Sequence, residues 1–183
     1  MIGDLAMHVA DLVENSLRAG ATEITVRLAR EGEDLRLEVE DNGAGIPPED
    51  FARVTDPFFS TKKGAGIGLG LPLLVQTAEE TGGSFRVEPR PGGGIRVTAR
   101  LGSRHPDLPP LGDLVGTLVP LIATSPGVEF TVELSDDRTA WTLSTREVRE
   151  RLGEVPLTHP DVLVFLERAL ADGLREVGFE EER

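Results

Sequence analysis

The sequence predicts an α+β fold, a two-layer sandwich in which helices cover one face of a β-sheet. Over residues 1–102, the patterns follow the order helix, two strands, short helix, glycine-rich loop, helix, two strands. The strands alternate apolar and polar residues, which is typical of a sheet with one buried face. Helices with an apolar stripe are the natural cover for such a face.

The opening helix is predicted over residues 4–19. Its apolar residues recur at the spacing of a single buried stripe, namely Leu5, Val9, Leu12, Val13 and Leu17. Asp4 is suited to cap the start of this helix, and Gly20 is suited to end it. Strands follow at residues 23–30 and 34–41, joined by a short hairpin loop.

A polar stripe follows the same helix at steps of three and four residues, formed by His8, Asp11, Asn15 and Arg18. Side chains at this spacing can converge on one ligand, and an acid, an amide and a guanidinium suit a metal-bound phosphate. Taken alone, such a stripe is more often an ordinary solvated helix face. However, the chain has only two asparagines, Asn15 and Asn42, and both lie in candidate motifs. The asparagine carbonyl is a ligand that Mg²⁺ accepts.

The second strand ends at Asp41, in the segment DNGAGIPPED. The alternation places the Asp41 carboxylate on the apolar face, where a buried charge needs hydrogen-bond donors. The amino group of a ligand such as adenine is one such donor, and Gly43 and Gly45 free the backbone to close around a flat ring. The alternative is a simple turn, since Asp-Asn-Gly is a strong turn signal.

The segment GAGIGLGLPLL places glycine at alternate positions before an apolar helix: Gly64, Gly66, Gly68 and Gly70. Glycine lets backbone amides approach a ligand, and the unpaired N–H groups of a helix start favour phosphate. The neighbouring Lys62 and Lys63 are the only lysines of the chain, and mobile ammonium groups suit a polyphosphate. The alternative is a linker with a solvated pair of lysines.

The rest of the chain divides at a proline-rich segment. Before it, a helical stretch is predicted at residues 48–55, a helix at 71–81, and strands at 84–88 and 95–101. Residues 103–113 have the composition of a linker. Residues 114–183 are expected to form a small α/β domain or an extension packed on the first part. Its predicted elements are a helix at 114–123, strands at 128–134 and 139–143, helices at 145–153 and 160–177, and a disordered acidic end.

Composition argues against several classes of function. The net charge is −13, with −5 over residues 1–102 (11 basic, 16 acidic) and −8 over residues 103–183 (8 basic, 16 acidic). This balance argues against broad binding of nucleic acid or anionic membranes. The chain has no cysteine, which excludes disulfides and thiolate metal sites. No signal-peptide pattern and no apolar run of about 20 residues is present, so a cytoplasmic protein is expected.

Four segments of the chain, taken in order, resemble a known set of motifs: VADLVENSLRAGAT, DNGAGI, DPFFSTKKG and GIGLGLPLLVQTAEETGG. They are similar to the N, G1, F and G2 boxes of the GHKL superfamily, the histidine kinase-like ATPases. That superfamily includes sensor histidine kinase catalytic domains, mismatch-repair ATPases of the MutL type, type II topoisomerases and Hsp90. The resemblance covers about residues 4–102, and it implies the Bergerat ATP-binding fold with ATP and Mg²⁺ as ligands.

The resemblance also implies roles for individual residues. Asn15 resembles the asparagine that ligates Mg²⁺, Arg18 resembles a basic residue that contacts the phosphates, and Asp41 resembles the carboxylate that binds the adenine amine. The full ATP-binding set that it implies is Asn15, Arg18, Asp41, Gly43, Gly45, Ile46, Lys62, Lys63, Gly64, Gly66, Ile67, Gly68, Leu69 and Gly70.

The chain departs from the family pattern at two points. Members that hydrolyse ATP usually carry glutamate four residues before the asparagine, whereas this chain has Asp11, a general base with a shorter reach. Sensor kinases also carry a phosphoacceptor histidine on an upstream helical hairpin. None of His8, His105 and His159 lies in such a pattern, so a complete sensor kinase is not expected.

The leading hypothesis is therefore a protein kinase catalytic module that uses ATP and Mg²⁺ to phosphorylate a separate protein. One alternative is a nucleotide-dependent conformational switch or slow ATPase, and another is a regulatory module that binds ATP without turnover. A homodimer is compatible with each of these hypotheses.

Overall fold

The computed structural model describes residues 3–54 and 70–179. Their elements in chain order are α1 (Leu5–Arg18), β1 (Glu23–Glu31), β2 (Asp34–Asp41), η1 (Pro48–Arg53), α2 (Gly70–Glu80), β3 (Ser84–Pro89), β4 (Ile95–Gly102), α3 (Leu114–Thr124), β5 (Glu129–Ser135), β6 (Ala140–Ser144), α4 (Thr145–Leu152) and α5 (Pro160–Glu176). The predicted strands and α-helices are present, with bounds that differ by no more than one residue. The helical stretch predicted at 48–55 is the 3₁₀ helix η1, a form that proteins use in such short pieces.

The strands form one sheet in the order β3-β4-β2-β1-β5-β6. Within the first hundred residues the pairs β1–β2, β2–β4 and β3–β4 are antiparallel. The strand β5 then pairs with β1 in parallel, and β6 adds to β5 as an antiparallel hairpin. The C-terminal strands therefore extend the sheet of the first part.

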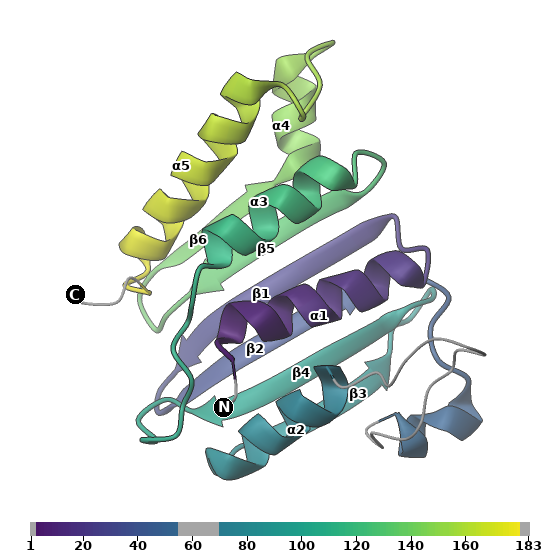
Figure 1. The fold of residues 1–183 in the computed structure, drawn as a ribbon, viewed down its shortest axis with the longest axis vertical. Helices are drawn as coiled ribbons and strands as arrows, with labels where there is room; N and C mark the ends of the chain where they lie inside the picture. Colours follow the sequence, from purple (N-terminus) through teal and green to yellow (C-terminus); the bar gives the residue numbers. More distant parts are fainter. Residues whose placement is uncertain (1–2, 55–69, 180–183) are drawn as a thin grey trace.

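The helices α1, α2 and α3 lie on one face of this sheet, with α1 between the other two (Figure 1). The predicted stripe of α1 faces the sheet, since Leu5, Val9, Leu12 and Val13 are buried. Asp4 caps α1 by accepting a hydrogen bond from the Met7 backbone N–H at 2.9 Å. Apolar residues of both halves of the chain form a single core, in which Leu118, Ile122 and Phe130 join the residues under α1.

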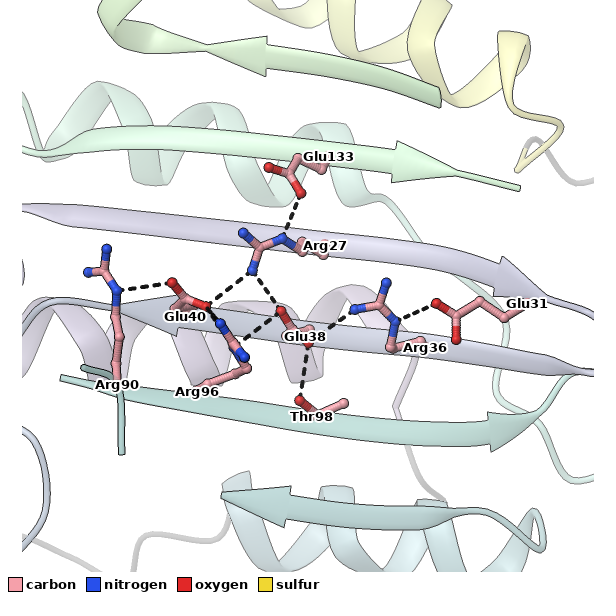
Figure 2. Close-up of polar contacts among 9 residues, drawn as sticks. All are labelled: Arg27, Glu31, Arg36, Glu38, Glu40, Arg90, Arg96, Thr98 and Glu133. Atoms are coloured by element: carbon pink, nitrogen blue, oxygen red, sulfur yellow. Dashed lines mark hydrogen bonds and ion pairs between the residues drawn. The ribbon is translucent and has the colours of Figure 1, made fainter. Parts of the chain in front are cut away.

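The other face of the sheet carries a network of arginine and glutamate side chains (Figure 2). Arg27 on β1 lies at its centre: its Nη1 is 2.6 Å from Glu38 Oε1 on β2, and its Nε is 2.6 Å from Glu133 Oε2 on β5. Burial alone would raise the pKa of Glu40, but hydrogen bonds and charge from Arg96 and Arg27 lower it below its ordinary value. The network therefore favours the ionised form of Glu40, and its Arg27–Glu133 ion pair joins β5 to β1.

No helix among residues 3–54 and 70–179 has both the length and the apolar composition needed to cross a membrane.

Candidate functional site

Asp41 lies at the end of β2 beneath α1, and its side chain is almost fully buried, with 3% of the residue exposed. Its Oδ2 accepts a hydrogen bond of 2.6 Å from the Ser16 hydroxyl, and its Oδ1 accepts one of 2.8 Å from the Gly43 backbone N–H. The alternation along the strand correctly predicted this inward orientation. Each carboxylate oxygen has a second lone pair, so Asp41 can still accept a hydrogen bond from a ligand amine.

Ser16 was not among the residues singled out from the sequence. It lies on the buried side of α1, one helical turn after Leu12, and only 3% of it is exposed. A hydroxyl in an apolar stripe needs a buried hydrogen-bond partner. That mismatch of polarity is the signal that could have identified Ser16, but its partner could be found only from the packing of α1 on β2.

The turn after Asp41 is held by backbone and side-chain contacts. Asn42 Oδ1 accepts hydrogen bonds from the backbone N–H groups of Thr22 and Glu23, at 2.8 and 2.9 Å. Asn42 therefore has a structural role at the start of β1, and only Asn15 remains as an asparagine for a metal. Two positions of the turn require glycine. A Cβ at Gly43 would lie only 2.9 Å from Ala19, which is too close. Gly45 has a φ of +75°, a backbone conformation that other residues rarely adopt.

A third contact to this turn comes from the loop between β3 and β4, residues 90–94. A Cβ at Gly94 would lie only 1.9 Å from the Asp41 backbone oxygen, and Gly94 has a φ of +85°. The β3–β4 hairpin thus presses directly on the end of β2. Ile46 is half-buried and lies between this turn and η1.

The polar stripe of α1 divides into a buried end and an exposed end. His8 is buried between helices, with its Nε2 3.2 Å from the Thr77 hydroxyl of α2. Asp11 and Asn15 are half-buried, and Arg18 is exposed. Arg18 donates a hydrogen bond to Asn15 Oδ1. The stripe therefore leaves Asp11, Asn15 and Arg18 at least partly accessible, while His8 contacts α2.

Asp11 faces the first residue of α2. A Cβ at Gly70 would lie 2.9 Å from the Asp11 Cβ and 3.0 Å from its Oδ2, so only glycine fits beside this carboxyl. Burial raises the pKa of Asp11, and Glu14 adds to that effect, whereas His8 and Arg18 oppose it. The structure thus places a carboxyl of raised pKa beside the start of α2.

The remaining predicted phosphate-binding residues lie outside the described residues. These are Lys62, Lys63, Gly64, Gly66, Ile67, Gly68 and Leu69. Of the glycine segment, the structure describes Gly70 alone. The described part of the site thus consists of Asp41 with Ser16 and the turn at Gly43, the exposed part of the α1 stripe, and the start of α2.

A divalent ion with ATP fits this donor set. Within the described ranges, no group of three or more histidine, aspartate or glutamate side chains is arranged to hold a metal ion. Mg²⁺ does not need such a group, because it commonly takes one or two protein oxygens and completes its shell with phosphate and water. Asn15 Oδ1 is a suitable protein oxygen, and it lies in the middle of the stripe.

The sequence comparisons agree with the motif resemblance. Residues 3–105 match the family described as Histidine kinase-, DNA gyrase B-, and HSP90-like ATPase, and the chain belongs to this family. The signal transduction histidine-protein kinase AfsQ2 of Streptomyces coelicolor is 35% identical over 101 residues, which are 53% of this chain and 19% of that protein. The sensor histidine kinase CpxA of Escherichia coli is 32% identical over 98 residues, 51% of this chain and 21% of that protein. This chain therefore spans about a fifth of the length of these relatives.

The structural comparison extends the likeness beyond the matched domain. The MutL ATPase domain of Aquifex aeolicus, solved with ADP, superposes with a TM-score of 0.53 over 83% of this chain and 68% of that chain, at 21% identity. At this identity the likeness shows a shared fold and no more. The predicted α+β sandwich of the histidine kinase-like ATPase type is confirmed.

Proposed function

We propose that this chain binds ATP with Mg²⁺ and serves as a protein kinase catalytic module that acts on a separate protein. The observation that carries the proposal is the buried Asp41 carboxylate, held at a strand end by Ser16 and the Gly43 N–H in a chain of the histidine kinase-like ATPase family. A buried carboxylate needs hydrogen-bond donors, and beyond these two contacts Asp41 keeps a second lone pair on each oxygen that a ligand donor can use.

In this proposal each described residue has a separate task. Asp41 accepts a hydrogen bond from the adenine amine, and Gly43, Gly45 and Ile46 form the wall beside the ring. Asn15 holds Mg²⁺, which when bound neutralises phosphate charge. Arg18 exchanges its hydrogen bond to Asn15 for a phosphate oxygen.

The glycine segment completes the site. Gly70 brings the N-terminus of α2 to the phosphates. Lys62, Lys63, Gly64, Gly66, Ile67, Gly68 and Leu69 are proposed to cover the phosphates.

A second candidate function is slow ATP hydrolysis that switches the conformation of the chain. The position of Asp11 favours it, because a half-buried carboxyl with a raised pKa beside the start of α2 can take a proton from an attacking water. The same group can take the proton of an acceptor side chain in the kinase reaction. The two functions therefore share a base and differ in what attacks the phosphate.

Incubation with ATP labelled on its terminal phosphate, in extract of the source cells, separates the functions. Label on another protein supports the kinase, free labelled phosphate supports the ATPase, and retention of intact ATP supports a regulatory module. Asp11→Asn is expected to suppress transfer or hydrolysis while leaving ATP binding in place, and unchanged turnover in that variant rules Asp11 out as the base.

Calorimetry with ATP tests the binding site itself. Asp41→Asn is expected to weaken binding by roughly 2–5 kcal/mol, because the amide presents a donor to the adenine amine in a desolvated site. Asn15→Ala is expected to weaken binding only when Mg²⁺ is present. Asp172→Asn, which changes the same charge on the outer side of α5, is the matched control and should bind like the wild type. Unchanged affinity in both site variants disproves the assignment.

A further inference from the structure

The helix α5 is held in one orientation by its inner face. Leu166 and Leu170 are fully buried, and Gly173 lies so close to the Trp141 indole of β6 that a Cβ there would come within 2.4 Å of the ring. This close packing defines which side of the helix faces β6. Figure 1 shows α5 at the border of the molecule, beyond α3 and beside β6, so its other face points away from the fold.

That outer face carries apolar side chains. Val164 is 43% exposed and Phe165 is 53% exposed, both in the N-terminal half of α5. The large apolar side chains exposed in the described parts of the chain are Met7, Leu73, Val155, Val164 and Phe165. Single exposed apolar residues are ordinary, but three of these five lie between residues 155 and 165. Of these three, Val164 and Phe165 are adjacent on the outer side of α5, and we take this side as a candidate contact surface.

Opposite charges flank the apolar pair at equal distances. Asp161 lies three residues before Val164, and its side chain is 95% exposed, with only His159 nearby at 3.8 Å. Arg168 lies three residues after Phe165, and it makes no hydrogen bond or ion pair with any residue that the structure describes. Further along, Arg175 and Asp172 already pair with each other at 2.8 Å. Asp161 and Arg168 are therefore an acid and a base beside the apolar pair that do not pair with each other or with Asp172 and Arg175.

The spacing of these four residues is self-complementary. Asp161 and Arg168 lie two helical turns apart, about 10 Å, on the same side of the helix. When a second α5 runs antiparallel across a two-fold axis between Val164 and Phe165, Asp161 of each copy faces Arg168 of the other. The apolar pairs then meet at the centre, as is usual for an isologous contact between helices.

We propose that two copies of this chain form a homodimer through the outer face of α5, with Val164 and Phe165 at the centre and two reciprocal Asp161–Arg168 ion pairs at the ends. A second copy is the occupant because the order acid, apolar, apolar, base is complementary to itself when reversed.

The dimer leaves the candidate nucleotide site open. The helix α5 contacts β6, at one edge of the sheet, whereas α2 contacts β3 and β4, at the other edge. The proposed contact surface is thus on the opposite side of the molecule from the start of α2. Dimer formation does not depend on ATP binding, so the two proposals can fail separately.

Sedimentation equilibrium over a range of concentrations tests the dimer with charge-swap variants. The wild type is expected to dimerise, and Phe165→Asp is expected to be monomeric. Asp161→Arg and Arg168→Glu should each weaken the dimer about tenfold or more, because each places like charges together twice. The double variant Asp161→Arg with Arg168→Glu should recover most of the wild-type affinity. Glu167→Arg, an exposed position on the flank of α5, should dimerise like the wild type.

Circular dichroism on every variant shows whether it is folded, since Asp161 also stabilises the first turn of α5. A monomeric wild type at all concentrations overturns the proposal. So does a dimer that survives Phe165→Asp, which would place the contact elsewhere, or a folded double variant that remains as weak as the single ones.

Discussion

At the scale of single residues, the contact between Ser16 and Asp41 orients the carboxylate at the end of β2. The hydroxyl of α1 and the N–H of Gly43 each take one oxygen of the carboxylate, so its plane and its remaining lone pairs have a defined direction. In the proposed site, a ligand amine would meet an acceptor that is already oriented. This arrangement reduces the ordering that binding would otherwise require.

Ser16→Ala is expected to lower ATP affinity without unfolding the protein. Loss of a hydrogen bond to a charged group corresponds to about 1.5–3 kcal/mol, or roughly a tenfold to hundredfold rise in Kd. Isothermal calorimetry measures this change. Ser103→Ala, which removes a surface hydrogen bond to the Glu33 carbonyl, is the control and should not change Kd. Equal Kd values for the two variants would contradict the role given to Ser16.

Asp11 illustrates a conflict between stability and chemistry at one position. Its pKa is raised chiefly by burial, so the folded state binds the proton more tightly than the unfolded state does. The stability linked to this group is complete below its ordinary pKa of about 3.9 and is lost as the pH rises through the raised value. The ionised carboxyl therefore destabilises the fold at neutral pH.

Asp11→Asn is expected to increase the free energy of unfolding at pH 7, by something on the order of 0.5 kcal/mol, because solvent screens this half-exposed group. The gain should shrink as the pH is lowered toward 4. Urea unfolding at pH 7 and pH 4.5 measures both values. A difference between variant and wild type that does not change with pH would show that burial of the charge is not its cause.

At the scale of elements, α1 and α2 are joined by a polar contact inside an otherwise apolar layer. His8 is 5% exposed and lies against the Thr77 hydroxyl. Burial lowers the pKa of His8, although Asp11 and Asp4 partly oppose the effect. The neutral ring is therefore the form that fits between the helices. Its contribution to stability is present above the ordinary pKa of about 6.5 and is lost as the pH falls through the lowered value.

His8→Gln is expected to flatten the fall in stability between pH 7 and pH 5. A single histidine can contribute at most about 1.4 kcal/mol for each pH unit in this range. Chemical unfolding of wild type and variant across the range gives the comparison. His159→Asn, at the exposed N-cap of α5, should keep the wild-type slope. If the free energy of unfolding of the His8→Gln variant falls with pH as steeply as that of the wild type, the His8–Thr77 contact is not the cause of the fall.

At the scale of the whole molecule, the parallel pairing of β5 with β1 joins the C-terminal part of the chain to the sheet formed by the first hundred residues. The ion pair of Arg27 with Glu133 crosses this junction on one face (Figure 2), and the shared core crosses it on the other. Thr145, fully buried at the start of α4, adds a hydrogen bond from the Phe130 N–H to its hydroxyl at 2.9 Å. Cutting the chain at the linker would expose the edge of β1 and part of the core.

The two halves are therefore expected to unfold in one cooperative transition. Trp141, the only tryptophan, lies on β6 and reports on the C-terminal part, while far-UV circular dichroism reports on all helices and strands. The midpoints from the two signals should coincide in urea. Separate midpoints would show that residues 114–179 unfold independently of the sheet to which they add strands.

The sequence by itself determined the elements and the class of protein. Apolar spacing placed the described α-helices and strands to within one residue, because periodicity is a local property of neighbouring side chains. The same alternation predicted the inward Asp41, and ordered motifs predicted the family. Only the tertiary structure decided that β5 pairs with β1, that Ser16 meets Asp41, and that Asn42 serves the turn. These contacts join residues far apart in the chain. They therefore depend on which strands and helices pack together, and the local spacing of apolar residues does not determine that packing.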